Sequence, residues 1–323
     1  MQKSTSELID VVQLDPRKFQ HPRTTADGQQ RARVGVDKLT TLWFNTGSLC
    51  NITCDNCFME SSPSNDALSY LNTAEVTAYL DELMHHQWPV TEIGFTGGEP
   101  FMNPDIMKML EAVLRRGLNA LVLTNAMKPM HHHREMLLDL HKQFADKLHL
   151  RVSMDHYTQA KHELVRGPKT WQPMLRGLRW LSKHGFAVAV AGRTLWHESE
   201  LQSRHGFGAF FASENIHIDA DHPAALVLFP EMDERVDVPE ITVDCWDILG
   251  QSPQSLMCAS SRMVVKRSGA MRPNVVPCTL LPYAPQFDLG PDLAAAVAAE
   301  VPLNHPHCAK FCVLGGASCS PDS

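Results

Sequence analysis

The chain has 323 residues, and its hydrophobic content of 44% is enough to fill a sizeable core. Lysine and arginine total 29 against 36 aspartate and glutamate, which gives a net charge of −7 without a long run of either sign. This balance argues against nucleic acid or an anionic membrane as the main partner, because both need a basic surface. No apolar run approaches the roughly 20 residues that cross a bilayer. The first ten residues also lack a signal-peptide pattern, so we predict a cytoplasmic protein.

The first 36 residues are predicted to form an N-terminal extension. They are polar, carry two prolines, Pro16 and Pro22, and show no periodic apolar pattern. Residues without a repeating apolar face have no surface to bury in a core of their own. We therefore expect an arm that lies along the surface of the protein.

Residues 37–235 alternate short β-rich apolar runs with amphipathic segments, which predicts parallel strands joined by helices. The right-handed crossovers of such units give either an open doubly wound sheet or an incomplete barrel. Functional loops are then expected at the C-terminal ends of the strands. The six expected strands are Leu39–Asn45, Thr91–Thr96, Asn119–Thr124, Leu148–Met154, Phe186–Ala191 and Ala225–Phe229.

Five helical patterns lie between these strands. The first is predicted to begin after a Thr73 cap and to bury one face, formed by Val76, Leu80, Leu83 and Met84. The second is predicted to begin at Asn103 and Pro104 and to end at Gly117. The remaining three patterns cover Met130–Asp146, Lys169–Lys183 and Glu198–Ala212.

Residues 236–323 are predicted to form a second, small α+β domain, and the acidic, proline-containing stretch Glu231–Gly250 is its connection to the barrel. Two strands, Ser261–Lys266 and Asn274–Pro277, read as a hairpin with Gly269 in its turn, and Asp288–Val301 reads as an alanine-rich helix. About 80 residues rarely hold together by core packing alone, so a bound metal cluster would contribute to their folding.

Nine cysteines are present, in a front group, a back group and an isolated Cys245 that we interpret as a small buried hydrophobe. An odd number in a chain without an export signal fits metal binding better than a disulfide framework. The front group consists of Cys50, Cys54 and Cys57, and the back group of Cys258, Cys278, Cys308, Cys312 and Cys319. Two separated groups predict two metal centres.

The front group follows the first strand in a CxxxCxxC spacing and is followed directly by Phe58. Soft thiolates favour zinc, copper(I) or an iron–sulfur cluster. A structural zinc site normally has four protein ligands, whereas a [4Fe–4S] cluster held by three cysteines leaves one iron free for another ligand. The missing fourth ligand is therefore where we expect the function to lie.

A second motif, GFTGGEP, covers Gly94–Pro100 at the end of the second strand. Adjacent glycines allow the backbone to approach a ligand closely, and the Glu99 carboxylate suits a ligand amine. A tight strand-to-helix turn would explain the glycines and the proline without a ligand, and this alternative stays open.

The two motifs, in this order and at these strand ends, resemble those of the radical S-adenosylmethionine (radical SAM) superfamily. The resemblance implies a partial (β/α)6 TIM barrel, and a [4Fe–4S] cluster on Cys50, Cys54 and Cys57 that chelates the amino and carboxylate groups of SAM. It further implies cleavage of SAM to a 5′-deoxyadenosyl radical that abstracts hydrogen from a substrate. A low-potential electron donor such as flavodoxin or ferredoxin is implied as a partner.

The same resemblance assigns roles to individual residues. Gly97, Gly98 and Glu99 match the segment that receives the SAM amino group, and Phe58 would lie near the adenine. Arg166 and Arg193 are candidates for the SAM carboxylate or an anionic substrate, because a guanidinium pairs bidentately with a carboxylate. Polar residues at the third and fourth strand ends resemble positions that face SAM: Thr124, Asn125, Ser153 and Asp155.

The C-terminal unit resembles the auxiliary-cluster domain called twitch, a short relative of the SPASM domain. The resemblance implies an auxiliary [4Fe–4S] cluster on Cys258, Cys278, Cys308 and Cys312, with Cys319 able to replace one of them. The distance from Gly269 to Cys278 and the terminal CxxxC spacing depart from the usual pattern.

The function predicted from the sequence is a radical SAM enzyme that acts on a small molecule. Maturation of a ribosomally made peptide is the alternative, and a non-catalytic zinc-binding protein is a second one. His156 and Tyr157 follow Asp155 and are candidates for reaching the substrate, whereas His131, His132 and His133 are interpreted as solvated.

Overall fold

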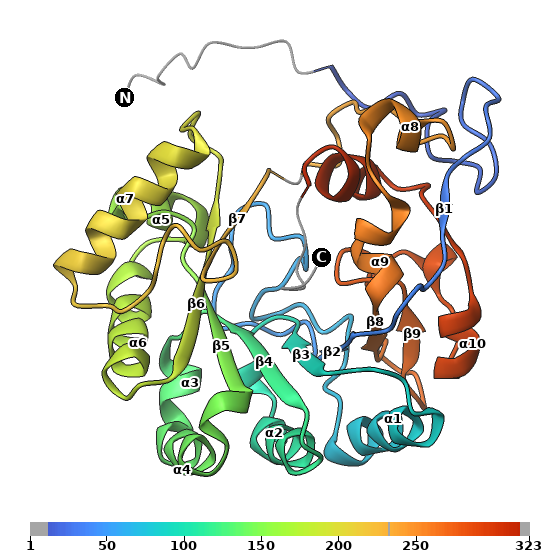
Figure 1. The fold of residues 1–323 in the computed structure, drawn as a ribbon. Coiled ribbons are helices and arrows are strands. Elements are labelled where there is room, and N and C mark those ends of the chain that lie inside the picture. The colour runs from blue at the N-terminus through green and yellow to red at the C-terminus, as the bar shows by residue number, and fades with distance from the viewer. Residues whose placement is uncertain (1–11, 232, 317–323) are drawn as a thin grey trace.

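The computed structural model describes residues 12–231 and 233–316, and its main feature is one curved sheet with strand order β7-β6-β5-β4-β3-β2-β8-β9 (Figure 1). The strands from β2 to β7 pair in parallel. They are β2 (Thr41–Asn45), β3 (Glu92–Thr96), β4 (Asn119–Thr124), β5 (Leu148–Ser153), β6 (Ala187–Arg193) and β7 (Leu226–Phe229). All six expected strands are therefore present, and the α/β class with a partial barrel is confirmed.

Helices connect these strands and lie along the outer side of the sheet (Figure 1). They are α1 (Thr73–His86), α2 (Ile106–Arg115), α3 (Lys128–His132), α4 (Arg134–Phe144), α5 (Gln159–Arg166), α6 (Trp171–Lys183) and α7 (Glu200–Ser213). In the described part of the chain, no helix combines the length and apolar content needed to cross a membrane.

The helix starts differ from the prediction by one to three residues. Asn72, not Thr73, caps α1: its Oδ1 accepts from the Glu75 amide at 2.9 Å, and Glu75 accepts from the Asn72 amide at 3.0 Å. Met84, expected in the core, is 53% exposed. The second helix begins after Asp105, because Asn103 instead closes a turn by accepting from the Asp105 amide at 2.8 Å.

Two other helical predictions need correction. The pattern at Met130–Asp146 is divided into α3 and α4 at His133. The helix α5 was missed, because Leu164 and Val165 are its only aliphatic residues apart from Ala160 and they give little periodicity. Leu164 is in fact 71% exposed.

The core lies on both faces of the strands. On β2, Leu42 and Phe44 pack outward against the helices, whereas Trp43 packs inward and is fully buried. The inward position of Trp43 requires a glycine opposite it, since a Cβ on Gly94 would lie 2.2 Å from the indole ring. The interior of the barrel is therefore filled by side chains below the level of the strand ends.

The C-terminal hairpin extends the barrel sheet. Strands β8 (Ser261–Val265) and β9 (Asn274–Val276) are antiparallel, as predicted, and β8 pairs in parallel with β2. The following helix, α10 (Leu293–Ala298), is shorter than predicted because Asp292 caps it and Val301–Pro302 forms β10. The predicted domain limits of 36 and 235 remain predictions.

The described part of the N-terminal arm lies against the C-terminal unit, where β1 (Arg33–Val34) pairs with β10. Arg31 is fully buried and forms an ion pair with Glu240. Its guanidinium also donates to the carbonyl of Leu303 at 3.1 Å. Buried polar contacts of Arg31 therefore join the arm to the C-terminal unit.

Candidate cofactor site

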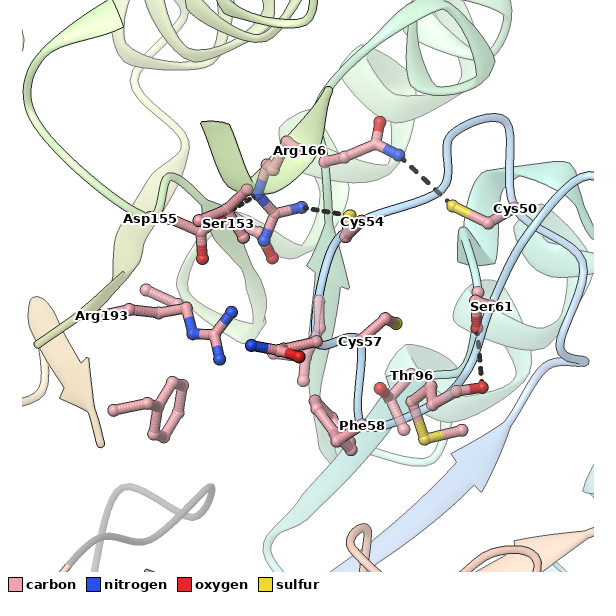
Figure 2. A pocket seen from close by; sticks show the side chains of 18 of the residues that line it. Cys50, Cys54, Cys57, Phe58, Ser61, Thr96, Ser153, Asp155, Arg166 and Arg193 are labelled. Atoms are coloured by element: carbon pink, nitrogen blue, oxygen red, sulfur yellow. Dashed lines mark hydrogen bonds and ion pairs between the residues drawn. The ribbon is translucent and has the colours of Figure 1, made fainter. Parts of the chain in front are cut away.

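A cavity of about 150 Å³ lies at the C-terminal ends of the parallel strands, and the three front cysteines line it (Figure 2). Nine of the ten side chains or backbone positions predicted to bind the cofactor also line it: Phe58, Gly97, Gly98, Thr124, Asn125, Ser153, Asp155, Arg166 and Arg193. Glu99 is the exception and lies below the cavity surface. The strand topology thus brings together residues spread over more than 130 positions.

The loop after β2 presents the cysteines because it folds back on itself. The amide of Cys50 donates to the Ser62 carbonyl at 3.0 Å, and Leu49 and Ser62 form a parallel bridge. Burial raises the pKa of Cys50 to about 12, and the nearby Glu99, Cys54 and Cys57 add to this effect. Burial therefore disfavours the thiolate form of Cys50, so a bound metal cation would be needed to balance its negative charge.

Arg166 supplies a permanent positive charge beside these sulfurs. Its Nε lies 2.5 Å from Asp155 Oδ2, and its Nη1 donates to Cys54 Sγ at 3.9 Å (Figure 2). Burial alone would lower the pKa of Arg166, but the charges of Asp155 and Cys54 outweigh it and raise that pKa. Burial also raises the pKa of Cys54, and Arg166 opposes this shift.

Arg193 differs from Arg166 because its guanidinium points into the cavity (Figure 2). Its backbone amide donates to the Asp155 carbonyl at 2.9 Å, which fixes the end of β6. Within residues 12–231 and 233–316, no ion pair is recorded for its side chain. Arg193 therefore brings a positive charge to the cavity wall.

The glycines of GFTGGEP allow β3 to approach the cysteine loop. A Cβ on Gly98 would lie 2.0 Å from the Leu49 carbonyl oxygen, and Gly97 has a φ of +130°. The Gly98 amide donates to the Gly47 carbonyl at 2.8 Å. Glycine is therefore needed at these two positions for the contact between β3 and the cysteine loop, whether or not a ligand also lies there.

Glu99 joins the ends of β3 and β4. Its carboxylate accepts from Thr124 Oγ1 and the Asn125 amide, both at 2.8 Å. Burial raises the pKa of Glu99 to about 7 against these lowering hydrogen bonds. The Asn125 side chain then reaches Cys50 Sγ at 3.9 Å, so Glu99 positions a residue that touches the cysteine loop.

Comparison with known proteins identifies the domain that carries both motifs. A model of the radical SAM superfamily matches residues 44–201, which carry both motifs. The chain contains a radical SAM domain. The cofactors of this superfamily are a [4Fe–4S] cluster and SAM, and the three-sulfur cavity fits them.

Similar proteins match only in part. The subtilosin biosynthesis protein AlbA of Bacillus subtilis is 29% identical over 182 residues, covering 56% of this chain and 38% of that protein. Fe-coproporphyrin III synthase of Methanosarcina barkeri is 27% identical over 161 residues, covering 48% and 37%. SuiB of Streptococcus suis bound to S-adenosylmethionine has a TM-score of 0.57 at 12% identity, covering 78% of this chain and 63% of that one. The matched segments thus span about two fifths of the curated relatives.

Several residues that line the cavity of the three front cysteines were not predicted from the sequence. Arg151 lies two residues before Ser153 on β5, and strand alternation could have placed it on the same face. Leu280, Phe229 and Phe311 also line the cavity, and the two phenylalanine rings stack at 5.5 Å. Leu280 and Phe311 come from the C-terminal unit, where no local sequence signal points to the barrel.

His156 and Tyr157 do not line the radical SAM cavity, so the suggestion that they reach the substrate is not supported. His156 is 2% exposed, and its Nε2 lies 3.1 Å from Glu198 Oε1. Tyr157 donates to the same carboxylate at 3.1 Å. Both residues therefore anchor the start of α7.

The structure brings four of the back-group cysteines to one second, small cavity: Cys258, Cys278, Cys308 and Cys312. Burial raises the pKa of Cys258 to about 11 and that of Cys308 to about 12. Cys319 lies outside the described residues. Cys245 does not belong to this group and is half-buried rather than buried, with its Sγ accepting from the Thr242 amide at 3.3 Å.

Arg262 is a fully buried cation beside this second cavity. Its guanidinium donates to the carbonyl of Cys258 at 2.6 Å and to the carbonyls of Ala296 and Ala299 at 2.9 and 3.0 Å. Burial lowers the pKa of Arg262 to about 10, and Cys258 and Cys278 oppose that shift. A buried guanidinium bonded to neutral carbonyls keeps its full charge close to these cysteines.

Proposed function

We propose that this protein is an enzyme that cleaves SAM reductively and abstracts hydrogen from a substrate held in the barrel. The observation that carries the proposal is the meeting of Cys50, Cys54 and Cys57 with Gly97 and Gly98 at one cavity. A structural zinc site of four cysteine or histidine ligands does not fit this cavity, because three cysteines and no histidine line it in the described residues.

When bound there, a [4Fe–4S] cluster supplies one electron to SAM, which yields methionine and the 5′-deoxyadenosyl radical that removes a substrate hydrogen. The chain's own residues hold and orient the reactants. Cys50, Cys54 and Cys57 would be the ligands, and Arg166 offsets thiolate charge at Cys54. Asn125 supports Cys50 from the end of β4.

Glu99 and the glycines would bind the SAM amino group. The Glu99 carboxylate has about four acceptor sites, and it accepts from the Thr124 hydroxyl and from the amides of Asn125 and Phe101. Among the described residues, Oε2 accepts only from the Asn125 amide, so one acceptor site remains. Phe58, Ser153 and Asp155 would contact the adenosine and methionine portions.

The substrate is proposed to be a small molecule with an apolar body and an anionic group. Arg193 points into the cavity, and Phe229, Leu280 and Phe311 form an apolar wall. Such a pairing of a cation with an apolar wall suits an organic acid. The name of the Methanosarcina relative, Fe-coproporphyrin III synthase, agrees with a small organic acid. An acidic peptide is the alternative, since the Bacillus relative is named for bacteriocin biosynthesis.

The second cavity is proposed to hold an auxiliary [4Fe–4S] cluster on Cys258, Cys278, Cys308 and Cys312. Four sulfurs around one small cavity, with Arg262 bonded to the Cys258 carbonyl, support this assignment. Zinc would fit the same four sulfurs. In a triple alanine variant at Cys50, Cys54 and Cys57, about four irons per chain would support the cluster, whereas zinc without iron would refute it.

A cytoplasmic location and a low-potential flavodoxin or ferredoxin as donor belong to the same proposal. The test is anaerobic reconstitution with iron and sulfide, followed by dithionite and SAM. The intact protein is expected to form 5′-deoxyadenosine, and Cys54→Ala is expected to form none. Failure of a fully loaded protein to form it would refute the enzyme assignment. Organic acids and acidic peptides can then be compared by how strongly each increases its formation.

A further inference from the structure

A basic groove lies on the outer side of the barrel between α3 and α6. It encloses about 650 Å³ and is lined by Lys128, His131, Arg134, Pro173, Arg176 and Trp180. Three of these are exposed cations and none is a carboxylate. The groove is therefore locally positive in a chain whose net charge is −7.

The cations of the groove have little local neutralisation. Among the described residues, neither Lys128 nor Arg176 has a recorded ion pair, and Arg134 reaches only its neighbour Glu135, at 4.0 Å. Burial lowers the pKa of His131, and the charges of Arg176 and Arg134 lower it further. Both observations show a positive potential that an acidic partner would offset.

The groove rests on the segment that supports the cysteine loop. Lys128 directly follows Met127, whose Sδ accepts from Asn51 Nδ2 at 3.8 Å, and Asn51 directly follows Cys50. The helix α6, which forms the other wall of the groove, packs against the same segment. A Cβ on Gly177 of α6 would lie 1.9 Å from the Ala126 carbonyl oxygen. Residues 125–127 thus separate the groove from Cys50.

We propose that this groove docks an acidic one-electron donor protein of the flavodoxin or ferredoxin type. This inference rests on the proposed function, which requires one external electron for each SAM cleaved. The donor would be oxidised by one electron and the cluster at Cys50 reduced by one, and that electron then breaks the sulfur–C5′ bond of SAM. Weak, charge-guided contacts of small area are typical of electron-transfer partners.

The test compares two triple charge reversals that change net charge equally. The groove variant is Lys128→Glu, Arg134→Glu and Arg176→Glu. The control variant reverses Lys38, Lys183 and Arg272 to Glu, which are exposed cations that do not line the groove. Both variants are loaded with cluster, and 5′-deoxyadenosine formation is measured with dithionite and, separately, with reduced flavodoxin at low salt.

With dithionite, both variants are expected to match the unmodified protein, since none of the six residues lines the cofactor cavity. With flavodoxin, the groove variant is expected to slow about ten-fold and the control to change less than two-fold. Equal flavodoxin rates in the two variants would overturn the proposal. Absence of product with dithionite in the unmodified protein would instead refute the proposed function.

Zero-length carbodiimide coupling to flavodoxin gives a measurement on the unmodified protein, independent of how the variants fold. A cross-link at Lys128 is expected, and it should weaken as salt increases because the attraction is screened. Cross-links at Lys38 or Lys183 without one at Lys128 would place the donor elsewhere and overturn the proposal.

Discussion

Gly177 in α6 gives the sharpest prediction about how the outer helices support the cofactor site. Its Cβ, if present, would lie 1.9 Å from the Ala126 carbonyl oxygen and 2.9 Å from the Ala126 Cβ. Gly177→Ala would gain about 1 kcal/mol of helix propensity. It would also force α6 away from the backbone of Ala126, and this should cost a free energy at the upper end of the about 1–3 kcal/mol typical of overpacking. We expect a net loss of about 2 kcal/mol.

Gly208 in α7 is the matched control, because its Cβ would make an ordinary 3.5 Å contact with Ala220 Cβ. Gly208→Ala is expected to stabilise the protein by about 1 kcal/mol. Thermal midpoints at one scan rate should fall by about 4 °C for Gly177→Ala and rise by about 2 °C for Gly208→Ala. SAM affinity should also weaken only in Gly177→Ala, since Asn125 precedes Ala126. Equal midpoints for the two variants would refute the reasoning.

Three further predictions concern buried charged groups. Arg166→Gln should lower the free energy of unfolding by about 3–5 kcal/mol, because it leaves Asp155 buried and unpaired. Adding Asp155→Asn should restore part of the lost thermal midpoint, and no recovery would contradict the pairing. Burial lowers the pKa of His162 to about 4, so between pH 6.5 and 4 the unfolded chain binds more protons than the folded one and stability falls as the pH decreases. Relative to the unmodified protein, His162→Leu should therefore be about 2 kcal/mol more stable at pH 5 than at pH 7.5. An equal difference in thermal midpoint between the two proteins at both pH values would contradict this. Arg262→Met removes a positive charge and should lower the reduction potential of the auxiliary cluster, whereas Arg262→Lys should change it less. The potential is measured by redox titration in the variant that lacks the three front cysteines. An unchanged potential in Arg262→Met would contradict an electrostatic role of Arg262.

The fold was largely predictable because its strands are short apolar runs between clear turn signals. The six strand positions agree to within two residues, since β-rich runs such as Asn119–Thr124 contain few alternatives. Helix starts were less predictable, because Asn72 and Thr73 are both good caps and only the hydrogen bonds distinguish them. The pairing of β8 with β2 had no local signal, as it joins residues more than 200 positions apart.

The site was predictable where one motif carries a ligand set or a strand end carries polar residues. Cys50, Cys54 and Cys57 share one loop, and Ser153 ends β5 with Asp155 two residues later. The role of Glu99 was less apparent, since its hydrogen bonds to Thr124 and Asn125 depend on β3 and β4 being neighbours. Phe311 was beyond reach of sequence reasoning, because the fold of the C-terminal unit alone brings it to the barrel.

The central claim is that the cluster on the front cysteines binds SAM directly, and hyperfine spectroscopy tests it most directly. The sample is a variant with Cys258 and Cys278 replaced by alanine, reduced and mixed with SAM labelled with ¹⁵N at its amino group. A ¹⁵N coupling to the reduced cluster is predicted, and it should disappear when Cys54 is also replaced by alanine. A loaded cluster that shows no ¹⁵N coupling at saturating SAM would contradict the claim.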